Sequence, residues 1–84
     1  SRTYHIYCGP GNNGADGLCL TQMMCALGIK CNAILVDEHS KSTEHAFFKS
    51  QLEKYFPEVV IRPQSLSDFI NEKSDIVAVD ALFG

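Results

Sequence analysis

The chain has 84 residues, of which 45% are hydrophobic and 20% charged, and this length and composition suit one small globular domain. Its net charge is −3 and its lysines and arginines are scattered, so nothing favours binding to nucleic acid or to an anionic membrane. No apolar stretch approaches the ~20 residues that a helix needs to cross a bilayer. We therefore expect a single domain over 1–84 that binds neither nucleic acid nor membrane.

Strands and helices alternate in the first half of the chain. Aromatic and β-branched residues predict a first strand over Tyr4–Cys8, and apolar residues predict a helix from about Asp16 to Leu27. Gly28 stands where the end of a helix commonly needs a left-handed residue. The short apolar run Cys31–Val36 is typical of a strand that is covered on both faces.

The second half continues the alternation. Ser42 or Thr43 is expected to cap a helix that ends before Pro57. Three further elements complete the series: a strand over Val59–Ile61, a short helix over 65–70 and a strand over Ile76–Val79.

The order βαβαβαβ predicts an α/β fold with a parallel sheet, Rossmann-like and doubly wound, with strand order 3-2-1-4. In that order the carboxyl ends of strands 1 and 4 lie side by side, and the segments that follow them meet in one crevice. The first two helices would cover one face of the sheet and only the short third helix the other. The chain is therefore interpreted as a fragment of a longer three-layer domain, or as one whose second face a partner covers.

Four of the six glycines fall in the predicted loop Gly9–Gly17, just before a helix. Glycine permits positive φ and close approach to the backbone, and a helix start offers free N–H groups, so this loop is the candidate ligand site. The loop matches G-x-G-x-x-G, and Asp37 follows the second strand, as in dinucleotide-binding domains. The charge of Asp16 and the amides of Asn12 and Asn13 argue against simple NAD binding.

The segment CGPGNNGADGL, followed by VDALFG, resembles the YjeF-type N-terminal domain that acts as NAD(P)H-hydrate epimerase. The resemblance covers essentially the whole chain in motif order. Members of that family are isomerases that interconvert the R and S epimers of hydrated NADH and NADPH for cofactor repair. They carry a potassium ion in the site.

The resemblance also implies the roles of particular residues. Asn13 and Asp80 would be potassium ligands, and amide and carboxylate oxygens do suit such a hard cation. Ala15 replaces the second of two glycines that are usual in the family. The remaining potassium ligand and an acidic residue proposed for catalysis lie beyond Gly84 in the family's longer domain, so the catalytic residue is unassigned. The residues expected to contact the substrate are Asn12, Asn13, Gly14, Ala15, Asp16 and Gly84.

By the same resemblance, the substrate is hydrated NADH or NADPH, and the partners are a second copy of the chain or a dehydratase, fused or separate. The expected location is intracellular, cytoplasmic or mitochondrial. Two alternatives stay open. One is a non-catalytic nucleotide-binding or structural module of the same fold in a larger assembly. The other is a plain dinucleotide-binding enzyme that uses Asp37.

Other residue types are expected to be structural. The three histidines, His5, His39 and His45, are predicted to be structural or solvated and away from the crevice. The four cysteines form no C-x-x-C pair and are interpreted as reduced core residues of a reducing compartment. Helical spacing places a further set in the core: Met23, Met24, Phe47, Phe48 and Phe56.

Overall fold

The computed structural model describes residues 2–62 and 75–81. Its elements, in chain order, are β1 (Arg2–Cys8), α1 (Asn12–Ala26), β2 (Cys31–Leu35), α2 (Thr43–Tyr55), a 3₁₀ turn (Pro57–Val59), β3 (Val60–Ile61) and β4 (Asp75–Ala81). The α/β class is therefore confirmed. The short helix expected over 65–70 lies outside the described residues.

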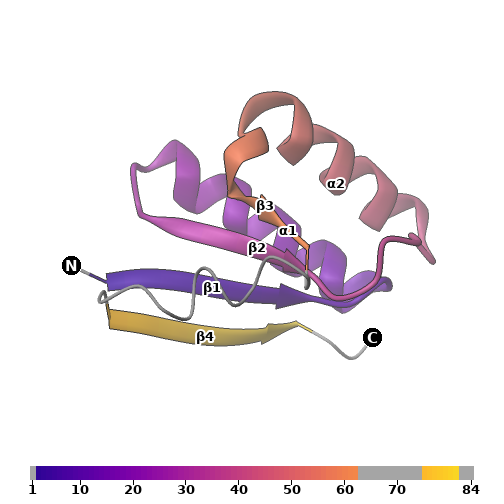
Figure 1. The fold of residues 1–84 in the computed structure, drawn as a ribbon. Coiled ribbons are helices and arrows are strands. Elements are labelled where there is room, and N and C mark those ends of the chain that lie inside the picture. Colours follow the sequence, from indigo (N-terminus) through magenta and orange to yellow (C-terminus); the bar gives the residue numbers. More distant parts are fainter. Residues whose placement is uncertain (1, 63–74, 82–84) are drawn as a thin grey trace.

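The strands form one parallel sheet, in which they pair in the order β3-β2-β1-β4. Both described helices lie on the same side of this sheet (Figure 1). Parallel neighbours need a crossover connection, and α1 supplies it between β1 and β2. The carboxyl ends of β1, β2 and β4 consequently point toward the same edge, which is where α1 begins.

The core lies between the sheet and the helices. It consists of the buried residues Ile6, Cys8, Leu18, Cys31, Ala33, Leu35, Leu52 and Val60. Three residues of the predicted core, Met24, Phe48 and Phe56, are partly buried and pack against this cluster, as expected.

The core assignment is wrong for Met23 and Phe47, whose exposed fractions are 59% and 56%. For Met23, the reason lies in the face that α1 turns to the sheet, which is built largely from small residues. Its buried positions are Gly14, Ala15, Gly17, Leu18 and Thr21. With those positions facing inward, Met23 falls on the outer surface of the helix.

The opposite face of the sheet is partly polar at its two central strands. Side chains alternate along a strand, so the neighbours of the core residue Ile6 point away from the helices. On this second face Thr3, His5, Asn32 and Ile34 are all buried. Three of these four buried residues are polar, so the second face is buried and largely polar at these strands.

The sequence correctly predicts the C-terminal end of α1 and the start of α2. Gly28 has φ 77°, and the amides of Gly28 and Ile29 donate to the carbonyls of Cys25 and Met24. This pair of bonds is the Schellman arrangement that closes a helix C-terminus. At the start of α2, the hydroxyl of Ser42 accepts a hydrogen bond of 3.0 Å from the His45 amide.

We expect Ser42→Ala to lower the free energy of unfolding by about 1 kcal/mol, because the first turn of α2 loses its side-chain cap. Ser50→Ala, at an exposed position inside the same helix, is the matched control and should change stability little. Denaturant unfolding of both variants measures the difference. Equal stability of the two variants would contradict the assignment of Ser42 as the cap.

Candidate functional site

Helix α1 begins at Asn12, four positions earlier than the sequence suggests. The amide of Ala15 already donates to the Gly11 carbonyl at 3.0 Å, so the turn is only Gly9–Gly11 and the rest of the predicted loop is helical. Gly11 is the N-cap, with extended backbone and no side-chain cap. Asp16, expected near the helix start, instead lies beyond the first turn and is exposed.

The early start of α1 depends on a contact between two glycines. A Cβ atom placed on Gly14 would lie 1.6 Å from the carbonyl oxygen of Gly9 and 2.6 Å from its carbonyl carbon. Both of these are backbone atoms that cannot rotate away. Close approach, and not positive φ, is therefore what requires glycine here, since Gly28 alone among the described residues has positive φ.

The substitution of alanine at position 15 is explained by the same geometry. Ala15 lies in the helix with an exposed fraction of 2%, and no described residue other than glycine has positive φ. An alanine side chain is therefore accommodated without backbone strain. The departure from the paired glycines does not disturb the local fold.

We expect Gly14→Ala to destabilise the protein by about 1–3 kcal/mol, the usual cost of overpacking. In a helix interior, alanine is normally more favourable than glycine by about 1 kcal/mol. A loss of stability in Gly14→Ala would therefore report the contact with Gly9. Gly11→Ala is the control, because a Cβ atom there meets nothing within 4 Å. If Gly14→Ala were as stable as the wild type or more stable in denaturant unfolding, the close contact would not exist.

The first turn of α1 is open to a ligand. Asn12 and Asn13 are both exposed, and the amides at a helix start have no partner within the helix. These N–H groups and the helix dipole favour an anion or a polar group. The arrangement therefore combines backbone donors with two amide side chains at the edge of the sheet.

The register of β4 brings the second motif to this edge. Asp80 is paired with Tyr7, and Ala81 with Cys8, the last residue of β1 before the glycine turn. Neighbouring strands lie about 4.8 Å apart, so residues that are distant in sequence become neighbours here. The structure thus brings the strand position of Asp80 close to the turn, whereas Gly84 lies outside the described residues.

The loop after β2 supports the glycine turn through backbone hydrogen bonds. The amide of Val36 donates to the Cys8 carbonyl at 3.1 Å, and the amide of Lys41 donates to the Pro10 carbonyl at 2.8 Å. Neither bond has a signal in the sequence, because backbone amides of any residue could make it. The turn is consequently held from the side as well as by α1.

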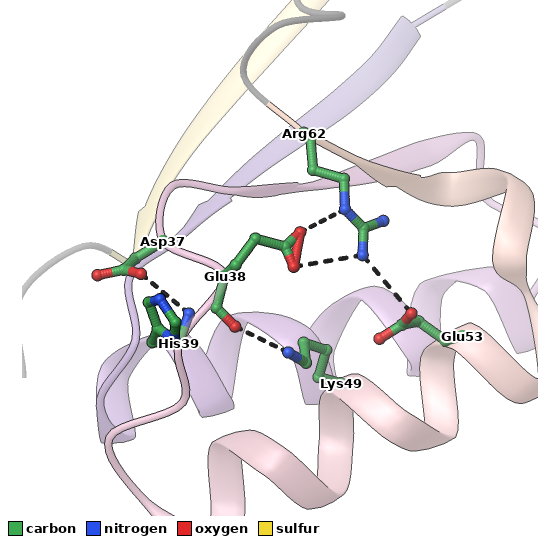
Figure 2. A network of polar contacts seen from close by, with 6 residues as sticks. All are labelled: Asp37, Glu38, His39, Lys49, Glu53 and Arg62. Carbon is green, nitrogen blue, oxygen red and sulfur yellow. Dashed lines mark hydrogen bonds and ion pairs between the residues drawn. The ribbon is translucent and has the colours of Figure 1, made fainter.

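Figure 2 shows how this loop is itself held. Glu38 forms an ion pair with Arg62, and its carbonyl accepts from the amino group of Lys49 at 2.8 Å. The Asp37 carboxylate accepts from the backbone amide of His39 at 2.9 Å. The ion pair is exposed and contributes about 1 kcal/mol at most, so its effect is to place the loop.

His45 lies next to the glycine turn, contrary to the expectation that no histidine would be near the crevice. Its side chain is fully buried, and its Nδ1 atom is 2.7 Å from the Ser40 hydroxyl. Its Nε2 atom makes no hydrogen bond of normal geometry within the described residues, although the Gly9 backbone is close enough to favour the charged ring. Burial lowers the pKa of His45, and the positive charge of Lys49 lowers it further. These two effects outweigh the Gly9 backbone and the Asp37 charge, which both raise the pKa.

The pKa of His45 predicts acid sensitivity. The ordinary value is 6.5 and the folded value is lower, so below about pH 6.5 the unfolded chain binds the proton more readily. Stability should therefore be unaffected by this group above pH 6.5 and fall as the pH drops below it. In His45→Gln this part of the pH dependence should disappear, whereas in His39→Gln, at an exposed loop position, it should persist. Unfolding midpoints measured between pH 7.5 and 5 test this, and identical slopes in both variants would overturn it.

A cation at this edge would draw on oxygen atoms. No group of three or more histidine, cysteine or acidic residues that could hold a metal exists among residues 2–62 and 75–81. Asn13 offers an exposed amide oxygen, and Asp80 lies at the end of the strand next to β1. Oxygen donors of this kind fit a hard cation such as an alkali ion better than zinc. Within the described part of the chain, no helix is long and apolar enough to span a bilayer.

The chain is similar to known proteins along its whole length. The family model for the YjeF-related protein N-terminus matches residues 1–84. An NAD(P)H-hydrate epimerase of Anaerococcus prevotii is 31% identical in an alignment of 90 residues. The alignment covers 98% of this chain and 39% of that protein. The chain therefore spans about two fifths of the length of this relative. No solved structure matches the chain.

Proposed function

The chain belongs to the family of YjeF-related protein N-termini, and we propose on that premise that its protein is an NAD(P)H-hydrate epimerase, an isomerase that interconverts the R and S epimers of hydrated NADH and NADPH. The observation that carries the proposal is the pairing of β4 with β1. It brings Asp80, from the second motif, next to the strand that leads into the glycine turn of the first motif. The relative's name supports the activity, and this arrangement supports a common site for the two motifs.

The start of α1 would bind the substrate. Free N–H groups of its first turn suit the negatively charged part of a nucleotide, and the exposed amides of Asn12 and Asn13 can donate to its polar groups. Gly14 and Ala15 are buried, and Gly14, packed on the Gly9 carbonyl, would set the shape of the backbone there. Asp16, exposed one turn further on, would contact a polar group at the rim.

Asn13 and Asp80 would hold a potassium ion. Both offer hard oxygen atoms, and the pairing of β4 with β1 puts Asp80 at the same edge as the helix that carries Asn13. The bound cation would supply positive charge that offsets the carboxylate and attracts the anionic nucleotide. The family resemblance assigns proton transfer at the hydroxylated ring carbon to an acidic residue beyond Gly84, so no described residue is given that role.

The wider architecture is part of the proposal. The four paired strands with two helices on one side are what one half of a Rossmann-like, doubly wound, three-layer domain would contain. In such a domain, ligands bind where the strand order reverses, which is between β1 and β4 here. A second copy of the chain or a dehydratase is the partner that this function would use.

The alternatives gain little from the structure. A residue unsuited to the site would favour a non-catalytic module, but Ala15, which replaces the family's usual glycine, fits its position without strain. Asp37, which a plain dinucleotide-binding enzyme would use for the ribose, already accepts a hydrogen bond from its own loop. Tight binding of undamaged NAD, lost in Asp37→Ala, would revive the second alternative.

The test is an epimerisation assay on the protein at its natural length. Hydrated NADPH in the epimer that a dehydratase rejects is mixed with excess dehydratase, and recovery of NADPH absorbance is followed with and without potassium. We expect a potassium-dependent rate that falls about 10-fold or more in Asp80→Ala, since even residues that only support a metal ligand change activity by about 10–100-fold.

Asp75→Ala is the matched control, because Asp75 lies on the same strand but at its opposite end, paired with Arg2. This variant should keep the potassium dependence and most of the rate. Equal rates in the two variants would refute the assignment of Asp80. No acceleration by a folded protein of natural length would refute the epimerase and favour a non-catalytic module.

A further inference from the structure

Two cysteines meet at the end of the sheet opposite the candidate site. Cys25 lies in the last turn of α1 and Cys31 is the first residue of β2, and their Sγ atoms are 3.5 Å apart. The Schellman turn at Gly28 reverses the chain between them and produces the contact. Formation of a disulfide would need the two sulfurs to approach to about 2.05 Å.

Hydrogen bonds orient the two thiols toward each other. The Cys31 thiol is 3.7 Å from the Thr21 carbonyl, to which it can donate. Its sulfur is then free to accept from the thiol of Cys25. Cys31 is held in place by burial, with an exposed fraction of 4%, so only a small movement of Cys25 would join the two sulfurs.

Cys25 can be reached from solvent. It is half-buried and, with Lys30 and Glu58, lines an open hollow of about 390 Å³ that extends to Cys31. Cys8, in contrast, is fully buried and its thiol donates to the Ile6 carbonyl. Cys19 is half-buried, and no cysteine sulfur lies in contact with its own among the described residues. Access and a neighbouring thiol thus coincide at Cys25.

We propose that Cys25 and Cys31 form a reversible disulfide by exchange with a small-molecule disulfide of the glutathione type, with Cys25 reacting first. The Cys25 thiolate attacks one sulfur of the small disulfide, forms a mixed disulfide and releases one thiolate, which takes up a proton. Cys31 then loses its proton and attacks the Cys25 sulfur, which expels the second small thiol. Two protein thiols are oxidised and one small disulfide is reduced to two thiols.

The second step is the slow one. Burial raises the pKa of Cys31 above its ordinary value, and this cause persists when Cys25 carries the small thiol. Few Cys31 side chains are therefore thiolates at neutral pH, and the thiolate is the attacking species. The mixed disulfide on Cys25 should consequently accumulate before the ring closes, and closure should become faster as the pH rises.

Mass spectrometry of the full-length protein tests the proposal. After incubation with glutathione disulfide, remaining thiols are alkylated and the unfolded protein is digested with trypsin without reductant. Cleavage after Lys30 separates the two cysteines, because peptide 31–41 contains Cys31 as its only cysteine and peptide 3–30 contains the other three. We expect the two peptides to be joined, and to separate on reduction.

Variants identify the partner of Cys31. The joined pair should persist in Cys19→Ser and be lost in Cys25→Ser, a change at a half-buried position that the fold should tolerate. In Cys31→Ala, glutathione should stay on Cys25 as the mixed disulfide. The proposal is overturned if the wild-type peptides remain unlinked, or if the link survives in Cys25→Ser. Because this end of the sheet is remote from the candidate site, neither result depends on the epimerase assignment.

Discussion

The close contact between Gly9 and Gly14 is the constraint on which the candidate site depends. It brings the first turn of α1 against the backbone that leaves β1, at a distance that no side chain would permit. The helix can therefore begin at Asn12, directly after a three-residue turn. Its unpaired N–H groups and the two asparagine side chains are placed at the edge of the sheet as a result. A larger residue at position 14 would push this whole group outward.

A second layer of contacts keeps that turn in place. The loop after β2 donates backbone hydrogen bonds to Cys8 and Pro10, and the buried ring of His45 fills the space beside Gly9. The loop is in turn fixed to α2 by Ser42 and by the contacts of Glu38. The candidate site is thus supported by parts of the chain that carry none of its chemistry. Such supporting residues commonly decide how well a site is preorganised.

The two ends of the sheet have different chemical character. At the carboxyl ends of the strands, glycines and amides collect around the start of α1, and the strand position of Asp80 lies at the same end of the sheet. At the other end, two thiols are in contact beside an open hollow. Helix α1 spans both ends, because it begins at the candidate site and finishes at Cys25 and the Schellman turn. The same helix therefore links the proposed nucleotide site to the proposed disulfide.

The sequence by itself determined the features that depend on local chemistry. Alternating apolar runs predicted the α/β class, Gly28 and Ser42 predicted helix ends, and the βαβ order predicted that the glycine turn and the second motif would be neighbours. These succeed because periodicity, capping and the handedness of crossovers depend on few residues and apply to most chains. The roles of Asn13 and Asp80 came from the motifs alone and stay predictions.

Only the tertiary structure decided the features that arise between distant segments. Four glycines within nine residues indicated a loop. Because Gly14 packs on Gly9, however, most of this segment is helical. His45 has no local signal that would predict its burial beside the turn, and Met23 is exposed because small residues occupy the buried face of α1. The contact of Cys25 with Cys31 likewise follows from how the end of α1 meets β2. In each case the deciding quantity is a distance between segments, which residue type and spacing along the chain do not fix.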